Sequence, residues 1–479
     1  MVRFHVRLFM KNDHFTNLEE IFRRHEMNNT TKEGIYNVKE LGTGKTVVLG
    51  LQHMFAMFGS TVLVPLLTGL DVSTTLLFAG IGTLLFHLLT KRKVPAFLGS
   101  SFAFLGGYMA IAPILEDGSS NVEMIPYACF GVACAGLLYL LLAALIKLFS
   151  AGRIMKFFPP IVTGPIIIAI GLTLSQSAID SCSTNWWIAL VAIIVVILCN
   201  IFGKGMIKII PILIGVIASY VVGICMGAVD FSGVKEAAWI GLPISKDMTV
   251  LALFGENFDA SKLITAIITI MPIALATIVE HIGDISAISS TTGKNYIKDP
   301  GLHRTLLGDG LATIVASLFG APANTTYGEN TGVLNLSKVY DPFVVRLAAC
   351  FAIFFSFCPK FSAVIQAMPT ATVGGISLVL YGMISAVGVR NVVENQVDFT
   401  KSRNVIIAAL ILVLSIGINY SAAGAIAFQI GQITISLSGL AVGALTGIIL
   451  NAILPGKDYV FDEEEPGDTG VDFEVGGRN

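Results

Sequence analysis

The sequence is poor in charged residues. Only 13% of its 479 residues are Asp, Glu, Lys or Arg, whereas about 25% is usual in soluble domains. Hydrophobic residues make up 54% of the chain, and the mean hydropathy is +0.79. This composition excludes a soluble globular domain, because most of the surface of such a chain must face lipid. It predicts a polytopic membrane protein embedded in a lipid bilayer.

The sequence also lacks the motifs of several functional classes. It has no GxxxxGK[ST] loop, so nothing indicates an ATP-driven pump, and no His, Cys, Asp or Glu cluster has metal-ligand spacing. No nucleophilic Ser lies in a strand–turn–helix elbow, so a membrane-embedded enzyme has no support. The seven cysteines are odd in number and mostly lie in apolar segments, which argues against a disulfide framework. We therefore expect no enzyme activity and no cofactor.

Apolar runs of spanning or near-spanning length occupy most of the chain. A membrane helix needs about 20 such residues. Fourteen runs can be marked: 46–67, 73–90, 94–115, 126–149, 158–179, 185–203, 206–227, 264–289, 301–321, 324–340, 342–366, 369–393, 402–422 and 437–454. The predicted fold is an all-α polytopic membrane protein with fourteen transmembrane segments.

Two polar, glycine-bearing stretches interrupt the third and the tenth of these runs. They are PAFLGSSFAF at 95–104 and NTTYGENTG at 324–332. A break in a membrane helix frees backbone N–H and C=O groups that lipid cannot satisfy, so protein or a ligand cavity must receive them. Matched breaks in the two halves of a chain point to the substrate site of a transporter. We therefore predict short extended segments in spans three and ten that meet near the bilayer midplane.

The distribution of Lys and Arg predicts the orientation. Basic residues follow spans two, four, six, eight, ten and twelve, whereas the loops after spans one, five, nine and thirteen have none. By the positive-inside rule both termini then face the cytoplasm. Each half has seven spans, which is an odd number, so the second half enters the membrane from the opposite side. The two repeats are therefore inverted. Residues 1–45 are expected to be a cytoplasmic N-terminal extension, and residues 455–479 an acidic cytoplasmic tail.

Ionisable residues inside apolar runs are candidate functional residues, because each costs about 2.5–3.5 kcal/mol to insert. Glu280 and Asp284 are four residues apart and share one helix face. Two adjacent carboxylates in a low dielectric cannot both ionise cheaply, so one is expected to hold a proton, as a proton-coupled carrier requires. The alternative is that one of them caps a broken helix or pairs with His53, which is better explained as a polar core residue. Three further ionisable residues are interpreted as structural: His87, Asp309 and Arg346.

The second break contains a carboxylate, Glu329. It can accept hydrogen bonds from the N–H groups of a planar ring, while the freed amides of the break donate to ring carbonyls. A cyclic imide or amide, with alternating N–H and C=O groups, matches this set. Phe102 and Tyr327 are candidates for a stacking face, and Tyr381 is a weaker one. The alternative is that Glu329 only ties the broken backbone together.

Five motifs contain most of these residues: LQHMFAMFG at 51–59, LGSSFAF at 98–104, EHIG at 280–283, DPGLHR at 299–304 and NTTYGEN at 324–330. Together they resemble the bacterial uracil permeases of the nucleobase–cation symporter-2 family, also called the nucleobase–ascorbate transporter family. The resemblance implies two inverted seven-span repeats. It also implies a core domain at 46–149 and 264–366 and a gate domain at 158–227 and 369–454.

The resemblance implies roles for single residues. Glu280 and Glu329 resemble the two carboxylates that hydrogen-bond the base, and the backbone around Phe102 and Gly328 would bond ring carbonyls. The remaining positions would line the site, support it or couple it to protons: Tyr327, Tyr381, Asp284, His53 and Asn330.

Glu329 and Asp284 resemble different branches of the family. Glu329 resembles the pyrimidine branch, whereas Asp284 stands where the best-known uracil carriers have His and resembles the purine and ascorbate branches. We expect import of uracil by proton symport across the cytoplasmic (inner) membrane, with a xanthine or urate carrier as the alternative and sodium coupling left open. An anion exchanger or channel of the same fold would need a positive residue near the breaks, and none is visible. The family also implies a homodimer, and no nucleic-acid partner is expected.

Overall fold

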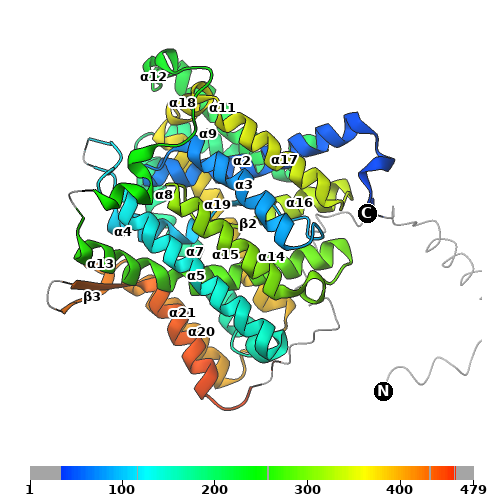
Figure 1. Cartoon of the computed structure of the whole chain (residues 1–479), viewed down its shortest axis with the longest axis vertical. Helices are drawn as coiled ribbons and strands as arrows, with labels where there is room; N and C mark the ends of the chain where they lie inside the picture. The colour runs from blue at the N-terminus through cyan, green and yellow to red at the C-terminus, as the bar shows by residue number, and fades with distance from the viewer. Residues whose placement is uncertain (1–33, 116, 256–257, 431–432, 458, 460–479) are drawn as a thin grey trace, which may run out of the picture.

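The computed structural model of the chain describes residues 34–115, 117–255, 258–430, 433–457 and 459, and it is mostly helical (Figure 1). Most of the predicted N-terminal extension (1–33) and of the predicted tail (460–479) lies outside the described residues. The α-helices are α2 (Thr43–Thr68), α3 (Val72–Leu89), α4 (Leu105–Ile111), α5 (Ile125–Phe149), α6 (Ala151–Met155), α7 (Pro160–Thr173), α8 (Ser175–Ser183), α9 (Trp186–Phe202), α10 (Met206–Ile209), α11 (Pro211–Cys225), α12 (Ser232–Glu236), α13 (Ala260–Ile270), α14 (Ala274–Thr292), α15 (Leu302–Leu318), α16 (Gly328–Ser337), α17 (Pro342–Ser356), α18 (Pro359–Gln366), α19 (Thr370–Glu394), α20 (Ser402–Asn419) and α21 (Gly439–Ile453).

Short strands and tight helical turns complete the described chain. The strands are β1 (Leu98–Ser100), β2 (Asn324–Thr326), β3 (Ala425–Ile430) and β4 (Ile433–Ser438), and they pair as β1–β2 and β3–β4. The turns are η1 (Val38–Glu40), η2 (Phe102–Phe104), η3 (Lys246–Met248), η4 (Val250–Phe254), η5 (Met271–Ile273) and the π-turn η6 (Ile297–Gly301).

Within the described residues, seven helical segments are long and apolar enough to cross a membrane, or eight if α17 and α18 are counted as one bent span. Each of the fourteen predicted runs contains at least one helical element. Several of these helices are shorter, with 10–17 residues: Phe102–Ile111, α9, α11 and α21. The helical content and these segments support the predicted polytopic membrane class.

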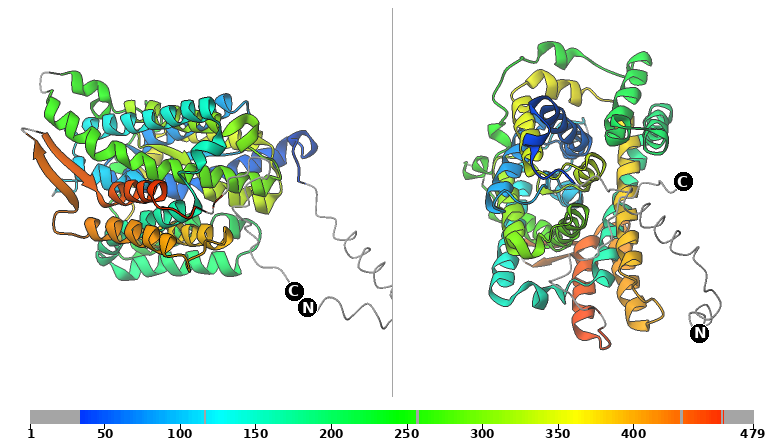
Figure 2. Two further views of the ribbon diagram at one scale, coloured as in Figure 1. Left: turned by 90° about the horizontal axis from the view of Figure 1, so that it is seen from below. Right: turned by 90° about the vertical axis from the view of Figure 1, so that its right-hand side faces the viewer.

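The helices pack into two groups. In the first, α15 contacts α3 and α5, and α17 contacts α2 and α3. In the second, α19 contacts α7, α8 and α9, and α20 contacts α7 and α21. Figure 2 shows α20 and α21 (orange to red) side by side and away from α2 and α3 (blue).

Glycines allow close approach of neighbouring helices in each group. A Cβ added to Gly136 of α5 would lie 2.9 Å from the Gly310 carbonyl oxygen of α15, and one on Gly310 would lie 3.0 Å from the Gly136 oxygen. The same relation joins α7 to α19, where a Cβ on Gly388 would lie 2.7 Å from the Gly164 oxygen. Small residues commonly allow close helix packing in lipid. There, moving an apolar side chain from lipid into a helix interface gives little hydrophobic stabilisation.

Three predicted runs are interrupted near a proline. The run 342–366 bends by 87° between α17 and α18, where Pro359 starts the new helix. Pro272 lies in η5, between α13 and α14, and Pro211 starts α11 after the short helix α10. Proline lacks the N–H that a helix needs and restricts the residue before it, so these interruptions have a local cause that the apolar pattern does not report.

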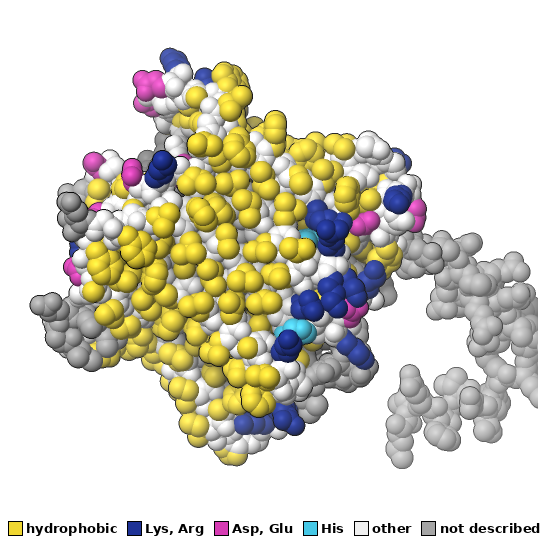
Figure 3. All heavy atoms as spheres, in the orientation of Figure 1, with side chains coloured by type: hydrophobic (Ala, Val, Ile, Leu, Met, Phe, Trp, Pro, Cys, Tyr) yellow, Lys and Arg dark blue, Asp and Glu magenta, His cyan; other side chains and the backbone are white. Residues whose placement is uncertain are grey.

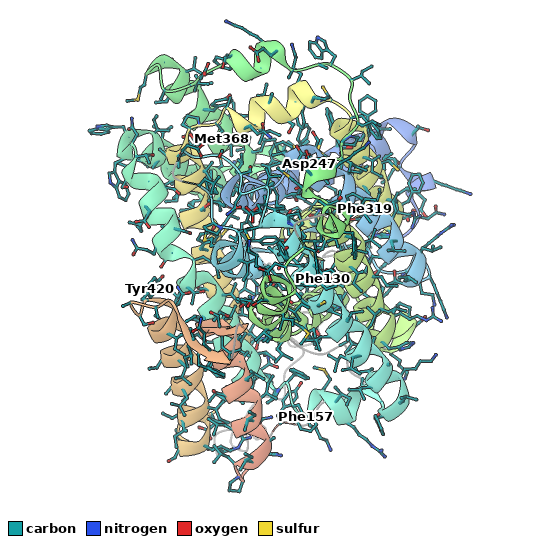
Figure 4. All side chains as sticks on the ribbon, turned by 60° about the vertical axis from the view of Figure 1, so that its left-hand side comes forward. Phe130, Phe157, Asp247, Phe319, Met368 and Tyr420 are labelled. Atoms are coloured by element: carbon teal, nitrogen blue, oxygen red, sulfur yellow. The ribbon has the colours of Figure 1, made fainter. Side chains whose placement is uncertain are left out.

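The β3–β4 hairpin was not predicted. It lies in the loop between the runs 402–422 and 437–454, with Ala425 opposite Ser438 in an antiparallel register. Tyr420 closes α20 just before the hairpin, and its hydroxyl donates to the Leu172 carbonyl at 2.8 Å (Figure 4). This bond ties the end of α20 to α7.

The described part of the predicted N-terminal extension is docked on the helices. Ile35 forms a parallel bridge with Val339, and the Tyr36 hydroxyl donates to the Thr292 carbonyl at 2.5 Å. The Tyr36 and Tyr340 rings are 5.4 Å apart. Residues 34–41 therefore pack against the ends of α14, α16 and α17 (dark blue beside α17 in Figure 1).

Candidate substrate-binding site

The two polar stretches from the two halves of the chain lie side by side as strands β1 and β2. Their antiparallel register places Leu98 opposite Thr326 and Ser100 opposite Asn324. Beyond the strands, the Tyr327 N–H donates to the Phe97 carbonyl at 3.0 Å. The pairing satisfies part of the backbone that lipid could not satisfy.

Side chains from neighbouring helices satisfy further backbone groups of the strands. The Thr83 hydroxyl of α3 lies 2.9 Å from the Leu98 N–H and 3.2 Å from the Leu98 carbonyl oxygen. The Thr313 hydroxyl of α15 donates to the Asn324 carbonyl at 2.9 Å, and the Asn324 side chain donates to the Phe78 carbonyl at 3.0 Å. These contacts hold both strands on α3 and α15.

The Tyr327 side chain crosses from β2 to β1. Its hydroxyl donates to the Ser100 carbonyl at 2.8 Å. A Cβ on Gly99 would lie 2.4 Å from the Tyr327 ring, so only glycine permits this crossing. Tyr327 thus has a structural contact in addition to its place in the cavity described below.

Each strand leads directly into a helical segment whose start has no side-chain cap. β1 continues into η2 and α4, and β2 continues into α16, whose N-cap residue Tyr327 makes no capping bond with its side chain. The first N–H groups of a helix have no partner within the helix and carry the positive end of its dipole. Phe102 and Gly328 are the first residues of these two segments.

A cavity of about 490 Å³ lies at these helix starts. One part of its wall comes from Phe55 and Ala56 of α2, in the first helix group. The segments η2, α14 and β2–α16 add Phe102, Glu280, Gly283, Asp284, Tyr327 and Gly328. The other part comes from the second group and includes Ile167 of α7 and Leu380, Met383, Ile384, Val387 and Asn391 of α19. Both helix groups therefore line the cavity, which is mainly apolar with a few polar groups, as small-molecule sites usually are.

The two carboxylates of α14 line this cavity and are half-buried. The Thr326 hydroxyl of β2 donates to Asp284 Oδ2 at 2.7 Å. Asp284 is therefore bonded to the strand pair, one helical turn from Glu280. The shared helix face predicted from their spacing is the face that meets the cavity.

His53 and Asn330 contact each other away from the cavity wall. The Asn330 side-chain nitrogen donates to the His53 carbonyl at 3.0 Å and lies 3.2 Å from His53 Nδ1. Both side chains are buried. They join α2 to α16, which favours the interpretation of His53 as a polar core residue.

Tyr381 lies behind the wall and is buried. Its ring meets the Phe102 ring edge-on, with centroids 5.7 Å apart and planes at 77°. Of the predicted stacking residues, Phe102 and Tyr327 line the cavity, and Tyr381 contacts Phe102. For Glu329 only the backbone, in the first turn of α16, is among the described residues; its side chain is not.

Two features of this region were missed from the sequence. Lys208 of α10 lines the same cavity, although no positive residue near the breaks was expected. His281 and Asp309 form a fully buried pair, with 2.9 Å between Nδ1 and Oδ2. His281 follows Glu280 directly, but no sequence signal joins it to Asp309, 28 residues away, which we had interpreted as structural. Within the described part of the chain, no group of three or more His, Cys, Asp or Glu could hold a metal ion.

Residues 44–424 match the model of a family described as the Permease family. The chain belongs to this permease family. The uracil permease of Bacillus caldolyticus is 39% identical over 438 residues, which cover 88% of this chain and 96% of that protein. The uracil permease of Escherichia coli K12 is 36% identical over 441 residues, which cover 88% and 95%. This permease is therefore a multi-pass membrane protein.

Solved structures with low sequence identity share the fold of this permease. The transmembrane domain of the cyanobacterial bicarbonate transporter BicA has a TM-score of 0.59 at 14% identity, over 88% of this chain and 99% of that one. A murine Solute Carrier 26 anion transporter in the inward-facing state has a TM-score of 0.57 at 10% identity, over 94% and 73%. At these identities the likeness concerns the fold alone.

Proposed function

We propose that this permease imports uracil across the cytoplasmic membrane by proton symport. The observation that supports it best is the cavity in which two carboxylates of α14 meet the uncapped starts of η2 and α16. The similarity to uracil permeases over most of both chains supports the choice of uracil.

The polar groups of the cavity complement the edge of a uracil ring. Its N–H groups need acceptors, which Glu280 supplies from α14. Its carbonyl oxygens need donors, which the first N–H groups of the helical segments that start at Phe102 and Gly328 would supply at the positive ends of those segments. Glu329 would supply a second carboxylate from the first turn of α16. The Phe102 ring would pack against a face of the base.

The small size of uracil makes complete pairing necessary. The best small ligands gain at most about 1.5 kcal/mol per non-hydrogen atom, and a buried polar group left without a partner costs about 1–3 kcal/mol. One unpaired N–H or carbonyl would therefore weaken binding about 5-fold to 150-fold. Selectivity for uracil would follow from the pairing rather than from buried apolar area.

The architecture that we propose is fourteen spans in two inverted repeats, divided into a core and a gate. The antiparallel β1–β2 pair, which joins spans three and ten, supports the repeat. So does the packing of α15 on α5 and of α17 on α3, because spans nine and four correspond to spans two and eleven in the other half. The first helix group would be the core and the second the gate. Because both groups line the cavity, movement of one against the other would change its access. With both termini cytoplasmic, the cavity wall at Lys208 would face the cytoplasm.

The coupling proton would be held by the Glu280–Asp284 pair. Both carboxylates line one low-dielectric cavity, where two adjacent negative charges are unfavourable. A proton on one of them in the loaded state would allow the neutral base and the proton to cross together. One charge moving down 100 mV supplies about 2.3 kcal/mol, or roughly fifty-fold accumulation.

Uptake of radiolabelled uracil into proteoliposomes tests the proposal. An inward pH gradient should drive accumulation above the external concentration, and a protonophore should abolish it. A sodium gradient without a pH gradient serves as the matched condition and should drive no accumulation. Uptake that follows sodium and ignores the protonophore would contradict the proton step, and absence of uracil exchange would contradict the substrate.

Two other functions are tested in the same vesicles. Asp284 favours a xanthine or urate carrier, for which xanthine or urate would suppress uptake of labelled uracil even when its concentration does not exceed that of uracil. Lys208 in the cavity, together with the fold shared with anion transporters, favours an anion exchanger. Chloride- or sulfate-dependent current in the absence of uracil would support that function.

The homodimer expected from the family is tested by the mass of the particle in detergent.

A further inference from the structure

Basic side chains from three elements gather at one end of the first helix group. Lys91 and Arg92 lie in the turn after α3, Lys147 in the last turn of α5, and Arg304 in the first turn of α15. We call these four residues the basic cluster. Figure 3 shows Lys and Arg side chains at one edge of a face that hydrophobic side chains otherwise cover.

The members of the basic cluster are close in space, although they are far apart in the sequence. Lys91, Lys147 and Arg304 all lie within electrostatic range of the His303 ring. A guanidinium nitrogen of Arg304 donates to the Leu89 carbonyl at 3.3 Å, which joins the start of α15 to the end of α3. Because α15 contacts both α3 and α5, the three ends form one surface.

The backbone under the cluster adopts an unfavourable conformation. Lys91 and Arg92 have φ values of 57° and 59°, in the left-handed region that residues with a Cβ rarely adopt. The Arg92 N–H donates to the His87 carbonyl at 2.6 Å, which helps to hold this turn. Such strain persists where the surrounding structure fixes it and is concentrated at functional sites. Both cationic side chains of this turn are exposed.

In the part of the chain that the structure describes, no acidic side chain pairs with the basic cluster. Among the described residues, none of Lys91, Arg92, Lys147 and Arg304 forms an ion pair with an acidic side chain, whereas neighbouring Lys93 does, with Asp299. Arg304 also lies at the positive end of the α15 dipole, where a cation is unfavourable. The cluster therefore concentrates positive potential for which an external anion is the natural partner.

Exposed apolar side chains lie next to the cluster. Leu88, in the last turn of α3, is 63% exposed, and Leu148, beside Lys147, is 75% exposed. A partner that carries a negative headgroup and an apolar chain would satisfy both surfaces at once. In a chain embedded in a bilayer, an anionic phospholipid has this chemistry.

We propose that the basic cluster is a binding site for an anionic phospholipid, with the headgroup on the four cations and an acyl chain along Leu88 and Leu148. Positive residues on this side of the membrane also fix the topology, but that role requires neither a strained turn nor the convergence of three elements. The site lies on the end of α3, α5 and α15, apart from the cavity, and does not depend on the identity of the transported molecule.

Native mass spectrometry of the detergent-purified full chain tests the site with phosphatidylglycerol and phosphatidylcholine as probes. The chain should retain phosphatidylglycerol at least about tenfold more tightly than phosphatidylcholine. Each cation near an anionic lipid surface changes binding roughly fivefold, so Arg92→Gln with Lys147→Gln should weaken phosphatidylglycerol binding about 25-fold. Both side chains are exposed, so the double variant should fold normally.

The matched control removes two other exposed basic residues, Lys156→Gln with Lys204→Gln, and should change binding less than about twofold. Equal retention of the two lipids by the unchanged chain would overturn the proposal. So would a double variant at Arg92 and Lys147 that binds like the unchanged chain or no more weakly than the control. Inorganic phosphate is added separately, because displacement of the lipid by phosphate alone would make the cluster a site for free anions.

Discussion

Replacing Gly328 by Ala tests the contact on which the proposed recognition of the base depends. Gly328 is the first residue of α16 and lines the cavity. A Cβ added there would meet no atom within 4 Å, so the new methyl group would project into open space without a clash. Alanine also has a higher helix propensity than glycine, so the fold should tolerate the change.

The expected loss of affinity follows from that geometry. The methyl group would keep a planar ring away from the free N–H groups of the first turn, so one ring carbonyl would lose its donor. A buried acceptor without a partner costs about 1–3 kcal/mol. The dissociation constant for uracil should therefore rise about 5-fold to 150-fold. The change in folding stability should stay within about 1 kcal/mol, because no packed atom is displaced.

Calorimetric titration of the purified protein with uracil, together with its thermal unfolding, separates binding from folding. Gly106→Ala is the matched control, because Gly106 is an exposed residue of α4 whose added Cβ also meets nothing within 4 Å. The control should bind uracil as the unchanged protein does. Normal affinity in the Gly328 variant, at normal unfolding temperature, would refute the contact between the start of α16 and the ring.

Two further substitutions test the carboxylates of α14. Glu280→Gln should raise the dissociation constant for uracil about 10-fold to 150-fold, since a charge-assisted hydrogen bond contributes about 1.5–3 kcal/mol; Glu236→Gln removes an equivalent charge from the exposed helix α12 and should leave titration unchanged. Thr326→Val keeps the side-chain shape but removes the donor to Asp284, so accumulation driven by a pH gradient should fall at least about fivefold while uracil exchange without a gradient persists. Equal losses of accumulation and exchange would show that this hydrogen bond supports binding and not coupling.

Local chemistry in the sequence located much of the candidate site. The polar stretches around Gly99 and Thr325 were identified because exposed backbone is excluded from lipid, and they lie opposite each other in the structure. Glu280 and Asp284 share one face because a helix returns to the same side after four residues, and that face lines the cavity. Residues that are close in the sequence define both the polar stretches and the shared helix face, so a single sequence is sufficient to predict them.

Contacts between elements that are distant in the chain could not be predicted from the sequence. The hydrogen bond from Thr326 to Asp284 and the buried pair of His281 and Asp309 depend on how helices and strands are arranged in space. Lys208 is one of the basic residues that follow span six in the sequence, but the break before α11 places it on the cavity wall. Hydrophobic periodicity reports which face of an element is buried, not which other element covers it.

The shared fold does not determine which molecule crosses the membrane. A bicarbonate transporter and an anion transporter have the same arrangement of helices at 14% and 10% identity. Helix starts facing a cavity create a positive potential, which by itself suits an anion. In this permease, Glu280 and Asp284 line the same cavity, and the negative charge that the pair keeps with one proton bound would oppose that potential and that of Lys208. A neutral ring that offers both N–H donors and carbonyl acceptors can use the helix starts and a carboxylate together, whereas an anion would be repelled by the carboxylate. The side chains of α14, more than the arrangement of the helices, therefore favour a nucleobase as the transported molecule.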